Sequence, residues 1–253
     1  MKTLSILSIL ILMCTAVVAN AQLVAFDDFS SGDKSGGFGW AGDWSEDAGA
    51  PVAMTFSSAN PLSNGVSAGY YNKANITSDY PHRILATPLQ AGTTPEVWAS
   101  TYLRPNTLPG GGWQFGIQIF DTNENGSNNY DVGAMCGLMF SENNWIRLAN
   151  SYAQNRTGDG TSQFTAGQET MLVMRFHKSS PADTVYNRAD LYADLDGTDG
   201  RYNNEVAIVT GYDLGSYATD QISLLRVNQS GFAVDFDFFA IGTTKESVVY
   251  PLP

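Results

Sequence analysis

The chain has 253 residues and carries 25 Asp and Glu residues against 13 Lys and Arg residues, which gives a formal net charge of −12 at pH 7. An acidic chain of this kind is not expected to bind nucleic acids or anionic membranes, because both attract basic proteins. Its 2 cysteines cannot supply a framework of disulfide bridges, so we expect the fold to depend on a hydrophobic core.

The N-terminal residues predict a secretory signal peptide. Lys2 precedes an apolar run from Leu4 to Val18, and the small residues Ala19-Asn20-Ala21 follow this run. Together they have the charged, hydrophobic and cleavage regions of such a peptide. We therefore expect cleavage after Ala21 and a secreted protein, extracellular or periplasmic, with no remaining membrane segment. Residues 22–253 are expected to form a single domain.

The rest of the chain is a series of short segments in which apolar and polar residues alternate, the pattern of half-buried β-strands. Dipeptides that favour tight turns, such as Asn64-Gly65 and Asp159-Gly160, separate many of them. No window has a sustained helical pattern, so we predict an all-β, antiparallel two-sheet jelly-roll sandwich. The predicted strands are Val24–Phe29, Val52–Phe56, Arg83–Leu89, Val97–Arg104, Trp113–Asp121, Ala134–Phe140, Met171–His177, Arg188–Leu195, Val206–Val209, Ile222–Val227 and Ala233–Ile241.

The last predicted strand is strongly hydrophobic. A period of two places Val234, Phe236, Phe238 and Ala240 on one apolar face. The opposite face begins with Asp235 and Asp237 and ends with Phe239 and Ile241. This order indicates a strand that starts at a solvent-exposed edge and runs into the core. Cys136 alternates with apolar residues in its own segment, and we predict that it is a buried core residue.

Six short motifs follow one another along the chain. They are Phe26-Asp-Asp-Phe29, Gly39-Trp-Ala-Gly-Asp-Trp44, Phe115–Asp121, Ser141–Ile146, Arg188–Tyr192 and Phe238–Thr243. In this order they resemble the motifs of the secreted bacterial laminin-G-like proteins of the concanavalin A-like lectin/glucanase superfamily. This resemblance implies a jelly roll with a concave and a convex sheet, whose first and last strands lie side by side, but it assigns no ligand.

The sequence matches known catalytic motifs only weakly. Retaining glucanases of this superfamily carry the string Glu-x-Asp-x-x-Glu, which sets two carboxylates about 5 Å apart, and this sequence lacks it. Asp235 and Asp237 are the nearest substitute, but they would project in parallel from one strand, about 7 Å apart. Gly65-Val-Ser-Ala-Gly69 matches the serine hydrolase string but lacks the following helix, so we interpret it as a turn entering a strand at Tyr70. No catalytic residue is predicted.

One loop matches the start of a calcium-binding loop. Asp121-Thr-Asn-Glu-Asn-Gly126 has the alternating oxygen side chains and the glycine turn, but Val132 stands where a bidentate glutamate should close the site. Calcium is therefore a candidate cofactor, and a plain polar hairpin loop is the alternative. Asp194–Gly200 is a second acidic loop, which turn chemistry explains equally well. The candidate ligands are Asp121, Asn123, Asn125 and Asp131.

Aromatic side chains near loops suit carbohydrate binding, since sugar rings stack on flat aromatic faces, although most aromatic residues of a sandwich belong to its core. The candidate ligand-binding residues are Trp113, Tyr130 and Trp145. The favoured hypothesis is a secreted, lectin-like module that binds an extracellular polysaccharide or a surface or matrix polymer. Two alternatives stay open: a structural or adhesive protein without a small ligand, and a polysaccharide-cleaving enzyme.

Overall fold

A computed structural model describes residues 22–45, 54–57, 62, 70–73, 81–108, 114–121, 134–139, 144–149, 156–195, 205–229 and 233–249. Within these ranges, no helix is long and apolar enough to cross a membrane. The predicted signal peptide lies outside them and stays a prediction.

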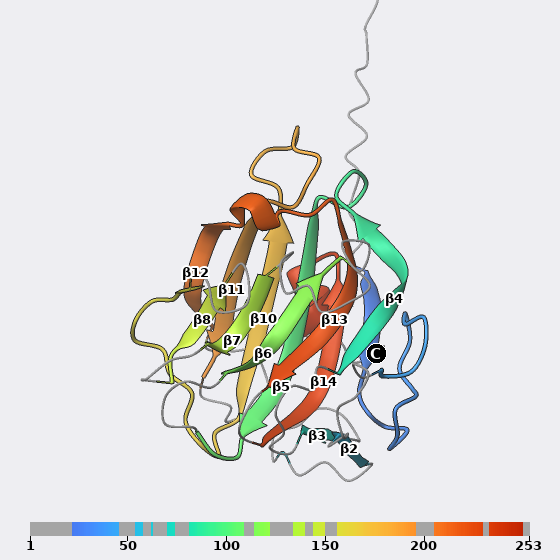
Figure 1. Ribbon diagram of the computed structural model, residues 1–253, viewed down its shortest axis with the longest axis vertical. Coiled ribbons are helices and arrows are strands. Elements are labelled where there is room, and N and C mark those ends of the chain that lie inside the picture. Colours follow the sequence, from blue (N-terminus) through green and yellow to red (C-terminus); the bar gives the residue numbers. More distant parts are fainter. Residues whose placement is uncertain are drawn as a thin grey trace, which may run out of the picture.

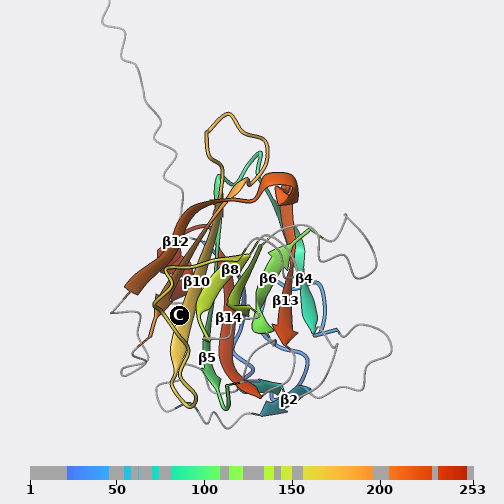
Figure 2. The same cartoon turned by 60° about the vertical axis from the view of Figure 1, so that its left-hand side comes forward.

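The described residues form two antiparallel β-sheets packed face to face, which confirms the predicted all-β jelly-roll sandwich (Figure 1). The two layers are separated in the view of Figure 2. The eight-stranded sheet has the order β12-β11-β10-β5-β14-β3-β2, and β1 also pairs with β14. Its strands are β1 (Leu23–Asp27), β2 (Met54–Ser57), β3 (Tyr70–Lys73), β5 (Glu96–Pro105), β10 (Thr170–His177), β11 (Arg188–Asp194), β12 (Glu205–Asp213) and β14 (Val234–Gly242).

The six-stranded sheet has the order β4-β13-β6-β7-β8-β9. Figure 1 shows β8, β7, β6, β13 and β4 side by side in front of the eight-stranded sheet. The helical elements among the described residues are short: a 3₁₀ turn, η1 (Gly215–Tyr217), and a C-terminal helix, α1 (Lys245–Val249). The strands of this sheet are β4 (His82–Gln90), β6 (Gln114–Phe120), β7 (Ala134–Met139), β8 (Ile146–Ala149), β9 (Arg156–Thr157) and β13 (Gln221–Gln229).

The first and last strands are direct neighbours, as the resemblance implied. Ala25 of β1 pairs with Ile241 of β14, and the two strands run antiparallel. β3 pairs with the first residues of β14 on the same edge as β1, and β5 pairs along the opposite edge. This hydrophobic strand thus lies inside the eight-stranded sheet, where both its faces are covered.

The main core lies between the sheets and contains the apolar faces predicted from alternation. Leu172, Met174 and Phe176 of β10 all belong to it, as do the alternating apolar residues of β11. Cys136 is fully buried in the same core, as predicted. Burial raises the pKa of its thiol to about 12, so the thiol is not a nucleophile at neutral pH.

The prediction for the faces of β14 was wrong in its second half. Val234 and Phe236 lie in the main core, but a register shift after Phe236 changes the phase, so Phe239 and Ile241 also face this core. Phe238 then packs on the opposite side, in a second apolar cluster beneath α1. A β-bulge of this kind reverses which side of the sheet each later residue faces.

The prediction that the acidic end of β14 is exposed to solvent was also wrong. Asp235 and Asp237 are both buried, and Asp235 accepts a hydrogen bond from Nη2 of Arg104 at 2.7 Å. A buried carboxylate needs such a partner, because its desolvation costs far more than one apolar contact contributes.

Residues 38–45 close one edge of the sandwich and connect the two sheets. Phe38 pairs with β1 of the eight-stranded sheet, whereas Trp40 and Ser45 pair with β4 of the six-stranded sheet. Gly39, between them, has a φ angle of 80°. A Cβ atom there would lie 2.0 Å from the carbonyl oxygen of Val24, so only glycine fits this crossing.

A buried ion pair holds the same edge. Asp27 of β1 and Arg83 of β4 form a salt bridge in which their side chains are 0% and 3% exposed. Asp27 also accepts hydrogen bonds from Nε1 of Trp44, at 2.7 Å, and from the backbone N–H of Phe29, at 2.9 Å. Arg83 further donates to the carbonyl of Gly42. The network therefore ties β1, β4 and the connecting segment together.

Candidate functional site

The candidate site lies on the outer face of the six-stranded sheet, the face turned away from the eight-stranded sheet. Gln118 stands between Ile117 and Ile119 in β6, and both isoleucines belong to the core. Arg226 stands in the same way between two core residues of β13. Because side chains alternate along a strand, Gln118 and Arg226 project from the outer face. They are direct partners in the strand register.

This pair belongs to a row that crosses the sheet, which we call the transverse row. Arg226 also pairs with His82 of β4, and Gln118 pairs with Met135 of β7, which in turn pairs with Ala149 of β8. Neighbouring strands lie about 4.8 Å apart, so His82, Arg226 and Gln118 follow one another across the sheet at that spacing. Three side chains that form hydrogen bonds are thus aligned on three neighbouring strands.

The central residues of the row are buried. Gln118 is 2% exposed and Arg226 is 5% exposed. The Arg226 guanidinium lies 4.7 Å from the ring centroid of Phe120, in a cation–π contact. Oε1 of Gln118 accepts no hydrogen bond from any residue that the structure describes. A buried amide oxygen without a donor is costly in a fold and needs an explanation, of which a ligand group is one.

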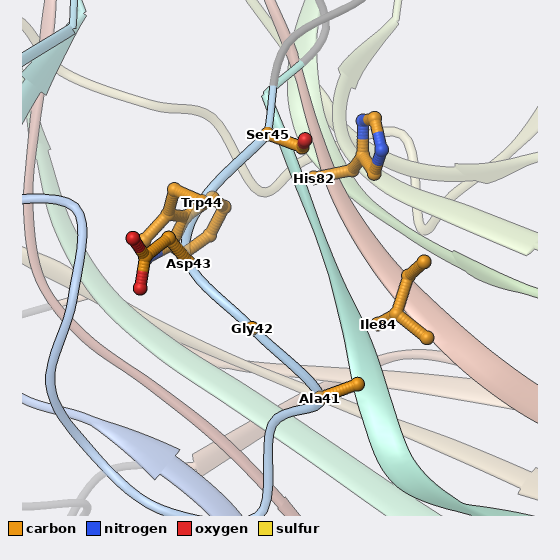
Figure 3. A pocket seen from close by; sticks show the side chains of 7 residues that line it. All are labelled: Ala41, Gly42, Asp43, Trp44, Ser45, His82 and Ile84. Carbon is orange, nitrogen blue, oxygen red and sulfur yellow. The ribbon is translucent and has the colours of Figure 1, made fainter.

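A depression of about 470 Å³ adjoins the His82 end of the row (Figure 3). Residues 41–45 form one side of it, and His82 and the exposed Ile84 of β4 form the other. Trp44 is buried and held by Asp27, so this side of the depression is rigid. In Figure 3 the carboxylate of Asp43 points away from His82 and Ile84. The depression is large enough for a sugar ring or two.

A second row on the outer face has no side chains at its centre. Arg147 of β8 pairs with Gly137 of β7, which pairs with Gly116 of β6, which pairs with Asn228 of β13. The two glycines are thus cross-strand partners in neighbouring strands, and neither carries a side chain. Arg147 is partly buried and its core neighbours in β8 place it on the outer face.

Charge is divided between the two sheets. No Asp or Glu occurs in the six strands described for the six-stranded sheet, which contains His82, Arg83, Arg147, Arg156 and Arg226. Carboxylates instead occur throughout the eight-stranded sheet. Their positions there are Asp27, Glu96, Asp190, Asp194, Glu205, Asp213, Asp235 and Asp237.

Of the three predicted aromatic residues, only Trp145 lies within the described ranges. It is partly exposed, directly before β8, and forms an isolated bridge with Gln163. The Arg147 guanidinium lies 4.8 Å from its ring centroid. Trp113 and Tyr130 lie outside the described residues. Trp145 thus stands two residues from Arg147, next to the candidate site.

The predicted calcium site is described only at its first residue. Asp121 follows β6, is buried, and accepts hydrogen bonds from Nε2 of Gln221 and from Oγ of Ser223, the latter at 3.1 Å. The other candidate ligands, Asn123, Asn125 and Asp131, lie outside the described residues. Within the described ranges, no three His, Cys, Asp or Glu side chains are grouped as metal ligands. Calcium binding stays a prediction.

A second polar cluster lies on the eight-stranded sheet, and its members neutralise one another. Arg175 donates to Glu96 at 2.8 Å and to Asp190 at 3.2 Å, and His177 lies 3.3 Å from the Asp190 carboxylate. The backbone N–H of Gly211 also donates to Asp190. Burial alone would raise the pKa of Asp190, but His177, Gly211 and Arg175 together hold this pKa below its usual value. The cluster is an internal ion-pair network.

The sequence analysis did not identify Gln118, Arg226 or His82 as site residues. The sequence contains one weak signal of this site. The segments 114–120 and 221–229 have no acidic residue, although the chain as a whole has an excess of acidic residues. Their alignment depends on the strand register, which brings together residues more than 100 positions apart in the sequence, and alternation within one strand does not reveal it.

The fold and the charge pattern define the class: an antiparallel two-sheet β-sandwich in which the described strands of one sheet contain no carboxylate. No protein-family model and no curated protein sequence matches the chain. Similar solved structures include lectin II from Ulex europaeus (TM-score 0.47, 11% identity, covering 75% of this chain and 92% of that one). The exoplasmic/lumenal domain of VIP36 is similar too (TM-score 0.45, 13% identity, covering 75% of this chain and 83% of that one).

An engineered GH43 glycoside hydrolase with endo-xylanase and exo-arabinofuranosidase activity also matches (TM-score 0.44, 14% identity, covering 68% of this chain). The match covers 34% of that enzyme, so this chain spans about a third of its length. With TM-scores below 0.5, none of the three structures assigns a ligand or a reaction to this chain.

Proposed function

We propose that this protein is a secreted carbohydrate-binding module, related to the laminin-G-like proteins, that holds an extracellular polysaccharide or matrix polymer against the outer face of its six-stranded sheet. The observation that carries this proposal is the buried amide oxygen of Gln118, which has no donor among the described residues although it lies within an aligned polar row. A sugar hydroxyl is a donor of the right kind, since its O–H can donate a hydrogen bond to an amide oxygen.

Three further features support binding. The depression beside His82 adds an apolar contact through Ile84 at the open end of the row. Trp145 and Arg147 supply an aromatic ring and a cation two strands away from Gln118. Gly116 and Gly137 carry no side chains that would keep a flat polymer from the sheet. These elements are rigid, because they are positioned by paired strands.

Binding without cleavage is part of the proposal. Glycoside hydrolysis by the usual route needs two carboxyl groups on either side of the scissile bond. The six strands that would contact the polymer contain no Asp or Glu. The buried Asp235 and Asp237 are in β14 of the other sheet. Calcium at the Asp121 loop remains a candidate for ordering the ligand-binding face and is not required for these contacts.

The test is retention of the exported and processed protein on a panel of immobilised polysaccharides, with calcium and again with excess chelator. We expect retention on at least one polymer and its loss in Gln118→Met, which keeps the side-chain volume but removes the amide. His82→Ala should weaken retention, whereas His177→Ala is a matched control on the opposite sheet and should not.

Stability distinguishes a binding role from a structural one. Gln118→Met replaces a buried oxygen that lacks a donor with an apolar group, so it should leave the protein equally stable or stabilise it by about 1 kcal/mol. Loss of retention together with loss of stability would point to a structural role for Gln118. No retention of the unaltered protein on any polymer would refute the proposed function.

A further inference from the structure

We propose, building on the proposed function, that the depression beside β4 binds an acetylated sugar of the polymer. Ala41 and Ile84 contact the methyl of the acetyl group, and the Ser45 hydroxyl donates a hydrogen bond to its carbonyl oxygen. The acetyl group is either an ester on a sugar hydroxyl or an amide on an amino sugar, since both carry the same methyl and carbonyl.

The depression has an apolar end and a polar end (Figure 3). The backbone N–H of Ala41 donates to the carbonyl of Ile84, so these two apolar residues are neighbours at one end. Ser45 and His82 exchange backbone hydrogen bonds at the other end. Two residues of one strand span about 7 Å, which leaves room for one small group between the two ends. An acetyl group has the matching division, because it joins a methyl to a carbonyl oxygen.

The apolar end is open and already formed. Ile84 is 43% exposed, although its neighbours in β4, Arg83 and Leu85, are buried. The opposite wall is fixed, because Nε1 of Trp44 donates to Asp27 at 2.7 Å. A methyl group placed against Ile84 removes apolar surface of both partners from water, which favours binding. Little of this free energy is lost in ordering the wall, since it is held before the ligand arrives.

The polar end supplies a donor. Ser45 is exposed, and its backbone N–H and carbonyl both bond to His82. Its hydroxyl forms no hydrogen bond with the residues that the structure describes. A serine hydroxyl can donate to a carbonyl oxygen. The position therefore suits an acceptor on the ligand.

Charge favours a neutral group in the depression. None of the described residues that line it is a lysine or an arginine. The neighbouring Arg83 is buried, and its guanidinium donates to Asp27 and to the carbonyls of Gly36 and Gly42. The carboxylate in the lining belongs to Asp43, and the chain has a net charge of −12. An anionic substituent would meet this negative charge without a compensating cation, whereas an acetyl group carries no charge.

The test compares sugars with and without acetyl groups. Binding of the exported protein to O-acetylated xylan would be measured by isothermal titration calorimetry, beside the same xylan after mild alkaline deacetylation. A second arm compares chitopentaose with cellopentaose, which carry an acetamido group and a hydroxyl at the same ring position. We expect about tenfold tighter binding to the acetylated member of one pair, the combined effect of one methyl contact and one hydrogen bond. The pair that shows it distinguishes the ester from the amide.

The matched variants are Ile84→Thr and Val206→Thr. Both residues are β-branched, lie in strands and are similarly exposed, at 43% and 39%, but Val206 is in β12 of the other sheet. Ile84→Thr should weaken binding to the acetylated sugar about fivefold and leave the deacetylated one unchanged, whereas Val206→Thr should change neither. Ser45→Ala should give a loss similar to Ile84→Thr. Ala41→Phe should fill the depression and abolish the preference. These positions are exposed, so the melting temperatures should stay within a few degrees.

The outcomes separate the two proposals. Equal binding within both pairs of sugars, or an unchanged preference in Ile84→Thr and Ala41→Phe, would overturn the acetyl inference. So would a failure of both acetylated sugars to bind. In each case retention on the wider panel of polysaccharides still decides the proposed function, and the absence of retention there would overturn both.

Discussion

Replacing Asp27 with alanine should destabilise this protein strongly, because it removes one half of a fully buried ion pair. Asp27 and Arg83 are 0% and 3% exposed, and the same carboxylate accepts hydrogen bonds from Trp44 and Phe29. Breaking such a pair leaves the other charge buried and costs about 3–5 kcal/mol. A domain of this size loses about 2–4 °C of melting temperature per kcal/mol, so the expected loss is about 10 °C.

The assay is urea unfolding followed by far-ultraviolet circular dichroism, with the same dependence on urea required of each variant. Asp213→Ala is the control, since it breaks the exposed pair with Arg188, and we expect a change within about 0.5 kcal/mol. The double variant Asp27→Ala with Arg83→Met should be more stable than the sum of the two single changes predicts, because no charge is then left buried. A loss below about 1 kcal/mol in Asp27→Ala would refute the idea that this network holds the edge of the sandwich.

Three further predictions follow from single residues. Gly39→Ala should lower the melting temperature markedly, because the new Cβ would overlap a backbone oxygen and the φ angle of residue 39 is 80°. Gly92→Ala is the control in the same thermal scan and should have little effect, because no atom lies within 4 Å of a Cβ placed there. The Cys136 thiol should resist alkylation at pH 8 until urea unfolds the protein, because burial raises its pKa to about 12; rapid labelling of the folded protein would contradict this. The folded-state pKa of Asp190 is below its unfolded value, so its contribution to stability is present above about pH 4 and is lost as the pH falls further. Asp190→Asn should remove that part of the acid dependence, measured as the urea midpoint between pH 3 and pH 6, and an unchanged slope would argue against it.

The fold class could be predicted because strand alternation is a local property. Leu172, Met174 and Phe176 fall on one apolar face of their segment, and this face lies in the main core, whereas Met171 and Val173 of the other face pack in the second apolar cluster. The face reversal in β14 could not be predicted in the same way. It arises where β14 pairs with β5, and the bulge after Phe236 depends on both strands. The strands β8 and β9 were missed because they are too short to show a period.

The candidate site was less predictable than the fold for a physical reason. Motif reasoning finds residues that are close in sequence, such as Asp121 and its loop, whereas His82, Arg226 and Gln118 are brought together only by cross-strand register. Polar residues in strands are also ordinarily assigned to a solvated face, so burial distinguishes Gln118 only once the sheet is assembled. The excess of acid in the composition masked a local concentration of basic residues.

The position of β14 also has a consequence for how the chain is made. This strand, residues 234–242, joins β5 to β1, although the ribosome synthesises it after both of them. Until these residues emerge, the eight-stranded sheet lacks the strand that links its two parts, and the two-layer core cannot close. The nascent polypeptide would thus stay without its closed core until residues 234–242 have been synthesised.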